Sequence, residues 1–285
     1  MEVKICDSAF THCWYMGGFG SYGRAPPYET EPQLSKYNIV WYRASNYRPT
    51  CWFTDNSLHL VDSVQAKYKV ALLIEPPAIC QYSYDYIKQN HHKFDYVLTY
   101  SIELVDIDPK KFLWCAPLAT SWLKSNEKMV YPKSKMVSII ARPTKNITEG
   151  HKLRHQIIAA YRHKLDVFGG GSHTSNPKLP MLRDYMFSFA IINSVYDDYY
   201  TEILTDCFAT GTVPIFWGTH NITKYFYPEG MIIFYDFNQV AEILVSLNHE
   251  LYVSKLPAIE RNFRLVCDYE FPEDYLYERF PFLFR

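Results

Sequence analysis

The stretch YMFSFAIINSVYDDYYTEILTDCFATGTVPIFWG, residues 185–218, determines how we interpret this sequence. An apolar run leads into a polar, tyrosine-rich corner at Asn193, and an amphipathic segment follows. Gly211 ends that segment, and a second apolar run closes on Gly218. This order predicts a βαβ unit, whose corner lies at the carboxyl end of a strand and the amino end of a helix. Free N–H groups at a helix amino end make such a corner a candidate anion site.

The composition of the 285-residue chain narrows the classes of protein to consider. Hydrophobic residues make up 48% of it, charged residues 21%, and the net charge is −1, so a large electrostatic surface for nucleic acid or anionic membrane is not expected. The seven cysteines form no CxxC pair and are typical of free thiols in a reducing compartment. We find neither a signal peptide nor an apolar run long enough for a membrane span, which favours a cytoplasmic protein.

The remainder of the chain alternates between strand-like runs and amphipathic helices. Strands are expected at residues 38–43, 69–75, 94–101, 136–141, 165–169, 187–192, 213–218 and 231–237. Helices are expected at 82–92, 149–164 and 238–248, and from Pro257 to about Tyr269. This alternation is typical of α/β proteins built from parallel sheets.

The polar stretch at 125–135 contains lysine and proline and is a candidate linker. We therefore predict an N-terminal domain over residues 1–130 and a second α/β domain over 131–256. Residues 257–285 are predicted to be a helical tail that can cross back to the first domain.

The pattern F-A-x-x-N-S, Y-x-T-E-x-L and G-T-V-P-I-F-W-G within residues 185–218 resembles the donor-site signature of glycosyltransferase family 10, the α-1,3/1,4-fucosyltransferases. Two further segments resemble the family in the right order. LLIEPPAIC, from residue 72, is similar to its strand that ends in a carboxylate and proline, and residues 136–171 are similar to the start of its donor domain. The resemblance covers roughly residues 69–240.

This resemblance implies the GT-B architecture, two Rossmann-like α/β domains facing a cleft. It implies a glycan acceptor on the N-terminal domain, a nucleotide-sugar donor such as GDP-fucose on the C-terminal domain, and inverting chemistry without a metal. Glu75 then matches the general base that accepts a proton from the acceptor hydroxyl. The alternative is that Glu75 only caps a loop after its strand.

The same resemblance implies a set of donor-binding residues. Arg154 matches an arginine that reaches the donor phosphates, a task that suits a guanidinium fork. Glycines after the strand at 165–169 allow close backbone approach. The donor contacts implied by the family match are Arg154, Gly169, Gly170, Asn193, Tyr199 and Glu202. The alternatives are a solvent-exposed arginine and ordinary acidic capping of a helix.

The sequence departs from the family pattern at four places. Met186 and Ile203 stand where the family has lysines, Ile192 where it has a glutamate, and Arg142-Pro143 where it has Ser-Asn. The lysine replaced by Ile203 is a phosphate ligand in the family. Our hypothesis is that Arg142, at the carboxyl end of its strand, partly replaces that cation as a donor-binding residue.

These departures leave two alternatives open. A UDP-sugar such as UDP-xylose could serve as donor, because residues 204–218 also loosely resemble exostosin-type transferases. A degenerate, non-catalytic glycan- or nucleotide-binding protein is the second alternative.

The DID sequence at 106–108 has the form of a metal-binding pattern, but three-residue acidic patterns often arise by chance.

Overall fold

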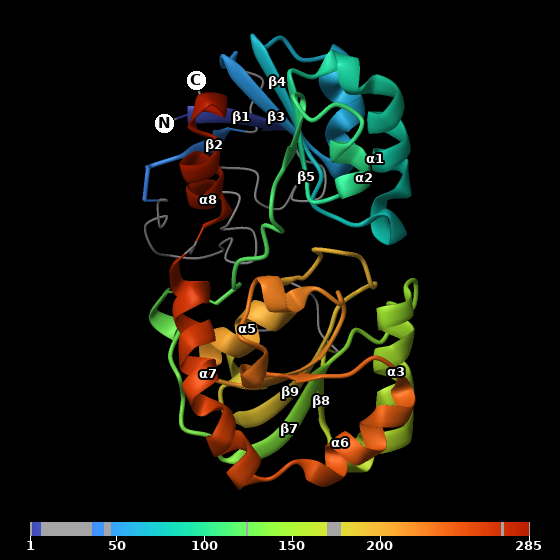
Figure 1. The fold of residues 1–285 in the computed structure, drawn as a ribbon, viewed down its shortest axis with the longest axis vertical. Coiled ribbons are helices and arrows are strands. Elements are labelled where there is room, and N and C mark those ends of the chain that lie inside the picture. Colours follow the sequence, from blue (N-terminus) through green and yellow to red (C-terminus); the bar gives the residue numbers. More distant parts are fainter. Residues whose placement is uncertain are drawn as a thin grey trace. The chain divides into compact units, whose positions relative to one another are not determined.

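A computed structural model describes residues 2–6, 36–42, 47–123, 125–169, 178–268 and 271–284, and its ribbon is drawn in Figure 1. The chain divides into two compact units. Unit 1 comprises Met1–Leu118 together with Tyr269–Arg285, and unit 2 comprises Ala119–Asp268. The C-terminal segment therefore returns to the unit in which the chain begins.

Unit 1 contains a six-stranded parallel sheet in the order β2-β1-β3-β4-β5-β6. Its strands are β1 (Glu2–Cys6), β2 (Val40–Tyr42), β3 (Thr50–Thr54), β4 (Tyr68–Leu72), β5 (Tyr96–Thr99) and β6 (Phe112–Trp114). Its α-helices are α1 (Pro77–Asn90), α2 (Ile102–Val105) and α8 (Pro272–Arg279), and short 3-10 helices include η3 (Asp55–Asp62), η4 (His91–Lys93) and η10 (Pro281–Leu283). Parallel strands need crossover connections, and most connections here contain a helix.

Both faces of this sheet are buried, as Figure 1 shows with α1 and α2 on one side and α8 on the other. Neighbouring residues of β3 alternate between two cores, because successive side chains of a strand point to opposite faces. Trp52 joins the core that contains Phe284 of the C-terminal segment, whereas Phe53 joins the core that contains Tyr84 of α1. The last residues of the chain thus complete the fold of unit 1.

Unit 2 contains a five-stranded parallel sheet in the order β11-β10-β9-β7-β8. Its strands are β7 (Lys135–Ile140), β8 (Asp166–Phe168), β9 (Tyr185–Ile191), β10 (Val213–Trp217) and β11 (Ile232–Ile233). Its α-helices are α3 (Glu149–Tyr161), α4 (Leu179–Leu182), α5 (Glu202–Thr210), α6 (Val240–Ser246) and α7 (His249–Asp268), and its 3-10 helices are η5 (Ser125–Glu127), η6 (Arg162–Lys164), η7 (Ile222–Lys224), η8 (Pro228–Gly230) and η9 (Phe237–Gln239).

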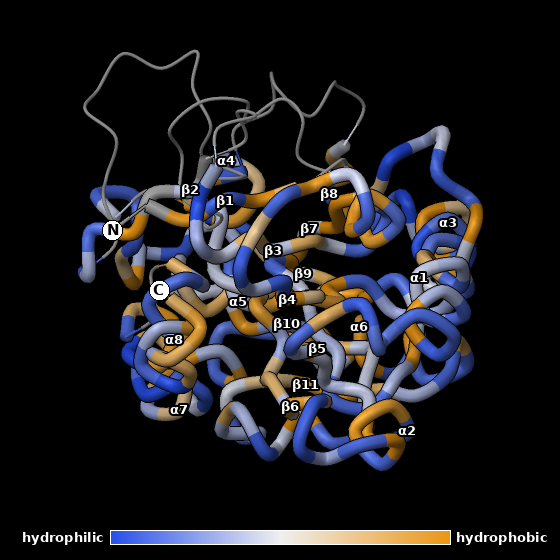
Figure 2. Tube along the Cα trace, turned by 90° about the horizontal axis from the view of Figure 1, so that it is seen from above, coloured by the Kyte–Doolittle hydropathy of each residue, from blue (hydrophilic) through white to orange (hydrophobic). Residues whose placement is uncertain are grey.

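The helices of unit 2 also cover both faces of its sheet, α5 and α7 on one side and α3 and α6 on the other (Figure 1). All seven residues of the central strand β9 are buried. Figure 2 shows hydrophobic residues along several strands, and hydrophobic and hydrophilic residues alternating along helices such as α3. The stretch at 185–218 forms the predicted βαβ unit, in which β9, α5 and β10 follow one another.

Two predicted elements differ in extent from those observed. The strand expected at 231–237 pairs over only two residues, since the N–H groups of Tyr235 and Asp236 donate to the Gln239 side chain instead of a neighbouring strand. The helix expected from Pro257 begins at His249, and Pro257 lies within it. Among the described residues, no helix combines the length and the hydrophobicity that crossing a bilayer requires.

Candidate functional site

Helix α3 begins at a capping box that the sequence encodes locally. The Thr148 side chain accepts a hydrogen bond from the His151 N–H, and Nδ1 of His151 accepts one from the Thr148 N–H. These contacts satisfy N–H groups that a helix start leaves open. Burial lowers the pKa of His151 to about 4, so the ring is neutral at physiological pH, and Nδ1 can accept in the tautomer that has its proton on Nε2.

The next turn of α3 carries Arg154, which is only 7% exposed. Its Nε donates to the carbonyl oxygen of Ile191 over 3.0 Å, and Nη2 donates to the same oxygen and, over 3.3 Å, to Oδ1 of Asn193. Nη1 has no hydrogen-bond partner within the described part of the chain. The alternative of a solvent-exposed arginine is therefore wrong.

Arg154 stays protonated at neutral pH although its side chain is buried. Burial lowers the pKa of Arg154 to about 10, and the charges of Glu202 and Tyr199 act in the opposite direction. The guanidinium is thus protonated at neutral pH. The Tyr199 side chain is itself buried, at 2% exposure, so its ring is not an open platform for stacking.

The first turn of α3 lies directly against the end of β9. The Gly150 N–H donates to the Asn193 carbonyl oxygen over 3.0 Å, and the Val195 N–H donates to Oε1 of Glu149 over 2.8 Å. A Cβ atom at Gly150 would lie 1.8 Å from the Ile192 carbonyl oxygen, far inside van der Waals contact. Glycine is therefore required for α3 to support the segment that carries Asn193.

We expect Gly150→Ala to separate α3 from β9 and to lower the free energy of unfolding by about 3 kcal/mol, as other overpacked sites do. The clash is with backbone, which cannot move aside as a flexible side chain can. Thermal or urea unfolding measures the change. Ala159→Gly on the same helix is the control for helix propensity, with an expected loss of about 1 kcal/mol. Equal losses in the two variants would contradict the close packing at Gly150.

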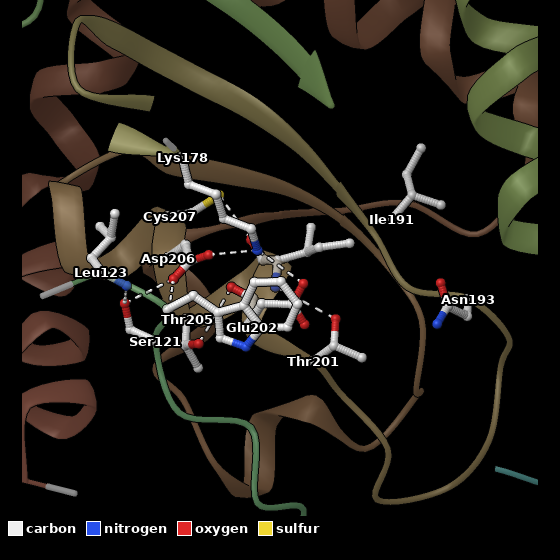
Figure 3. Close-up of polar contacts among 12 residues, drawn as sticks. Ser121, Leu123, Lys178, Ile191, Asn193, Thr201, Glu202, Thr205, Asp206 and Cys207 are labelled. Atoms are coloured by element: carbon white, nitrogen blue, oxygen red, sulfur yellow. Dashed lines mark hydrogen bonds and ion pairs between the residues drawn. The ribbon is translucent and has the colours of Figure 1, made fainter. Parts of the chain in front are cut away.

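At the other edge of the corner, Thr201 caps α5 and Glu202 opens its first turn. Figure 3 shows the Lys178 side chain reaching both Glu202 and Asp206. Its Nζ lies 2.9 Å from Oε1 of Glu202, 2.9 Å from Oδ2 of Asp206, and 4.0 Å from the centre of the Trp122 ring. Oε2 of Glu202 accepts no hydrogen bond from any residue that the structure describes, so it is available to a ligand hydroxyl.

Asp206 extends this network to the segment by which the chain enters unit 2. Its Oδ1 accepts hydrogen bonds from the Ser121 hydroxyl over 2.8 Å and from the Trp122 N–H over 2.7 Å. Burial disfavours the Lys178 ammonium, but the carboxylates of Asp206 and Glu202 together outweigh burial and raise its pKa. Lys178 is therefore a fixed cation that holds Glu202 in place.

Lys178 and Asp206 were not among the site residues predicted from the sequence. The available signal was Asp206 itself, the one acidic residue after Glu202 in a helix of mostly apolar residues, and it is fully buried. A buried carboxylate requires a cation or several donors. Residues four apart on a helix lie on one face, so both carboxylates can share one partner.

We expect Lys178→Met to weaken binding of a nucleotide sugar and to destabilise unit 2 by about 3 kcal/mol, because it leaves two carboxylates without their cation. Asp206→Asn is the matched variant, since an amide can still accept from Ser121 and Trp122. It should lose less stability than Lys178→Met. Calorimetric titration and thermal unfolding measure both effects, and a Lys178→Met protein of native stability and affinity would contradict the assignment.

One acidic residue of the corner has a structural role. Asp198 has a positive φ of 60° and is buried. Its Oδ1 accepts from Nδ2 of Asn221 over 2.8 Å and from the Tyr225 hydroxyl over 2.7 Å, and Lys224 Nζ lies 3.3 Å away. Asp198 thus fastens the corner to the segment after β10.

The other predicted donor residues of unit 2 have different surroundings. Gly169 has a φ of +115°, and a Cβ atom there would lie 2.2 Å from the Ala141 carbonyl oxygen, so this glycine is needed for chain packing. Gly170 lies outside the described residues. Arg142 is half-buried just after β7, and its role in binding the donor remains a hypothesis.

The structure also shows the surroundings of three residues that depart from the family pattern. Ile192 is fully buried, and a Cβ atom at Gly218 would lie 2.7 Å from its Cγ1 atom. Ile192 is therefore a core residue. A glutamate at this position, as in the family pattern, would be buried away from water. Ile203 is half-buried in the first turn of α5, and Met186 is buried in β9.

In unit 1, Glu75 lies three residues after β4 and immediately before Pro76 and Pro77, the latter the first residue of α1. The residue is half-buried. Its carbonyl oxygen accepts from the Tyr84 hydroxyl over 3.2 Å. Glu75 is thus held at the carboxyl edge of the sheet, where parallel α/β sheets bind their ligands.

One family model matches the part of the chain that contains most of these residues. The model of the domain described as glycosyltransferase family 10 (fucosyltransferase) C-term matches residues 130–255. This range contains Arg154, Asn193, Glu202 and the supporting Lys178. Most of the second unit therefore matches the glycosyltransferase family 10 domain. A search of curated proteins found no match.

Solved structures show the same fold over nearly the whole chain. A crystal structure of an α1,3-fucosyltransferase with GDP-fucose has 12% identity and a TM-score of 0.52, covering 94% of this chain and 89% of that one. A structure of α1,3-fucosyltransferase with GDP has 15% identity and a TM-score of 0.53, covering 94% and 90%. TarM has 13% identity and a TM-score of 0.53, covering 83% of this chain and 54% of TarM.

These structures share the GT-B fold, and the two parallel-sheet units of this chain have it too. The fold and the family 10 domain together identify the protein as a glycosyltransferase. No group of three or more potential metal-ligating His, Cys, Asp or Glu side chains occurs among the residues that the structure describes.

Proposed function

We propose that this family 10 protein is an inverting, metal-independent transferase that moves a sugar from a nucleotide donor, GDP-fucose by resemblance, to a hydroxyl of a glycan. The proposal rests chiefly on Arg154, which is buried and yet charged at neutral pH. Its guanidinium donates hydrogen bonds to the end of β9, and Nη1 has no hydrogen-bond partner among the described residues. A guanidinium in that state suits a diphosphate oxygen.

Glu202 completes the proposed donor site. Lys178 engages one of its carboxylate oxygens, and the other can accept from a hydroxyl of the ribose or the sugar. Asn193 and the N–H groups at the start of α5 lie at the same edge of the sheet. Lys178 pairs with both Glu202 and Asp206, and the charge of Glu202 also acts on Arg154, so the two cations and two acids leave the site without donor close to neutral.

In the proposed reaction, Glu75 accepts the proton of the acceptor hydroxyl while that oxygen attacks the anomeric carbon. The bond between this carbon and the β-phosphate oxygen breaks, and the nucleoside diphosphate leaves with the electron pair. A single displacement of this kind inverts the anomeric centre. The charge that develops on the leaving diphosphate is stabilised by Arg154 and the N–H groups of α5.

Calorimetric titration with GDP-fucose, GDP-mannose, UDP-xylose and UDP-glucose tests the donor. We expect a GDP-sugar to bind and UDP-sugars to bind at least about tenfold more weakly, a difference of about 1.4 kcal/mol. Preference for a UDP-sugar would replace the GDP-fucose assignment with the UDP-linked alternative. Binding followed by no release of nucleoside diphosphate, with or without oligosaccharide acceptors, would indicate a non-catalytic protein.

Addition of EDTA tests the metal requirement, and we expect the rate of nucleoside diphosphate release to stay unchanged. The proposed mechanism gives the task of neutralising the diphosphate to Arg154 and helix N–H groups. A rate that falls with EDTA and returns with Mg²⁺ or Mn²⁺ would contradict metal-independent transfer.

A further inference from the structure

The segment that carries Glu75 is held almost entirely by side chains. The last sheet-like bond before it joins the Leu73 N–H to the Leu98 carbonyl oxygen. Beyond this point, the N–H groups of Ile74 and Glu75 both donate to Oδ1 of Asp55, over 3.0 Å and 3.4 Å. Asp55 belongs to the junction between β3 and η3, so a neighbouring strand end supports this loop.

Two tyrosines complete the support from other elements. The Tyr100 hydroxyl, just after β5, donates to the Ile74 carbonyl oxygen over 3.2 Å. The Tyr84 hydroxyl, from α1, donates to the Glu75 carbonyl oxygen over 3.2 Å. All four backbone polar groups of the Ile74-Glu75 dipeptide are therefore bonded to side chains, which restricts this segment to one position.

Asp55 occupies its place at an energetic cost. Its φ is +31°, and the residue is 2% exposed. A residue other than glycine in this backbone region costs on the order of 1–3 kcal/mol, and such strain gathers at functional sites. Glycine would tolerate the backbone better but could not accept the two hydrogen bonds. Aspartate is thus needed at this position for its carboxylate, which accepts the hydrogen bonds from Ile74 and Glu75.

The carboxylates of Asp55 and Glu75 both act on the thiol of Cys80 in α1. Burial raises the pKa of the Cys80 thiol to about 12, and the negative charges of Asp55 and Glu75 add to the increase. The neighbouring Asn56 side chain accepts from Cys80 Sγ over 3.6 Å.

We propose that Asp55 is a positioning residue for Glu75 and that Tyr84 and Tyr100 act with it. The three side chains fix the main chain of Glu75, so that its carboxylate meets the acceptor hydroxyl at one place. This inference rests on the proposed role of Glu75 as general base. Proton transfer needs hydrogen-bond reach, and a displacement of about 1 Å can lower a rate about 10²-fold.

The test compares Asp55→Gly with Asp55→Asn. Glycine relieves the strained φ and removes the acceptor, whereas asparagine retains an acceptor oxygen and tolerates a positive φ. We expect Asp55→Gly to lower kcat on the order of 10²-fold with an unchanged KM for the donor, and Asp55→Asn to lose less than about tenfold. Asp62→Asn, at the exposed end of the same 3-10 helix, is the control.

Three results bear directly on the inference. Native kcat in Asp55→Gly would overturn it, as would parallel changes in kcat and in the KM for the donor. If Asp55→Gly does not fold, the double variant Tyr84→Phe/Tyr100→Phe removes two hydroxyls and keeps both rings. We expect it to lower kcat about tenfold at constant donor KM, and an unchanged kcat would overturn the inference.

A double-mutant comparison separates this inference from the role of Glu75. If Asp55 acts through Glu75, Glu75→Gln/Asp55→Gly should have nearly the residual activity of Glu75→Gln alone. An additional loss of about 10²-fold in the double variant would show that Asp55 acts independently, and the inference would be wrong. High activity in Glu75→Gln alone would instead refute the general base.

Discussion

Replacing Glu75 with glutamine is expected to lower kcat for sugar transfer by about 10²- to 10⁴-fold, the usual contribution of a general base. Glutamine preserves the size and shape of the side chain and removes only its ability to accept a proton. The residues proposed to bind the donor all belong to unit 2, whereas Glu75 belongs to unit 1. Donor affinity should therefore stay within about twofold of the native value.

The measurement is release of nucleoside diphosphate from the donor selected by titration, with water or an oligosaccharide as acceptor. Glu103→Gln is the matched control, because Glu103 is an exposed carboxylate of the same unit paired with Lys88 over 2.6 Å. An exposed pair of this kind contributes little, so this variant should keep native activity. Comparable activity in the two variants would remove Glu75 from the mechanism.

Replacing Arg154 with methionine is expected to weaken donor binding roughly 10²- to 10³-fold. Each hydrogen bond between the guanidinium and a phosphate contributes about 1.5–3 kcal/mol. Methionine fills a similar volume but also leaves the Ile191 carbonyl oxygen without the donors it has in the native protein. We therefore expect a lower melting temperature as well.

Arg154→Lys separates charge from geometry, since lysine keeps the charge and lacks the planar fork. It should bind the donor with an affinity between those of the native and methionine proteins. Lys152→Met, an exposed position on the same helix, is the control for removing a cation from α3. Native donor affinity in Arg154→Met, measured at a temperature where the protein is folded, would exclude Arg154 from the donor site.

Much of the fold was predictable because its elements are strongly patterned. The βαβ unit at 185–218 is marked by two apolar runs, a corner and a terminal glycine, and Gly211 adopts the left-handed conformation that ends α5. By contrast, β11 was predicted too long. Periodicity could not reveal that the Gln239 side chain satisfies the N–H groups of Tyr235 and Asp236.

The candidate site was predictable where one residue type carries the chemistry, as for Arg154 and Glu202. Its supports were not, because they come from distant parts of the chain. Lys178 and Ser121 meet Asp206 across separations of 28 and 85 residues. Likewise, Asp55 reaches Ile74 and Glu75 from another strand. A single sequence contains no local pattern for such contacts, whereas the buried acid in α5 was an indication that a partner exists.

A crystal structure with the tightest-binding nucleotide sugar tests the central claim most directly. We expect the diphosphate to lie within hydrogen-bond distance of Nη1 of Arg154 and close to the first turn of α5, with a donor hydroxyl bonded to Oε2 of Glu202. Lys178 should still bridge Glu202 and Asp206. A donor bound away from the end of β9, or a diphosphate that does not contact Arg154, would contradict the account.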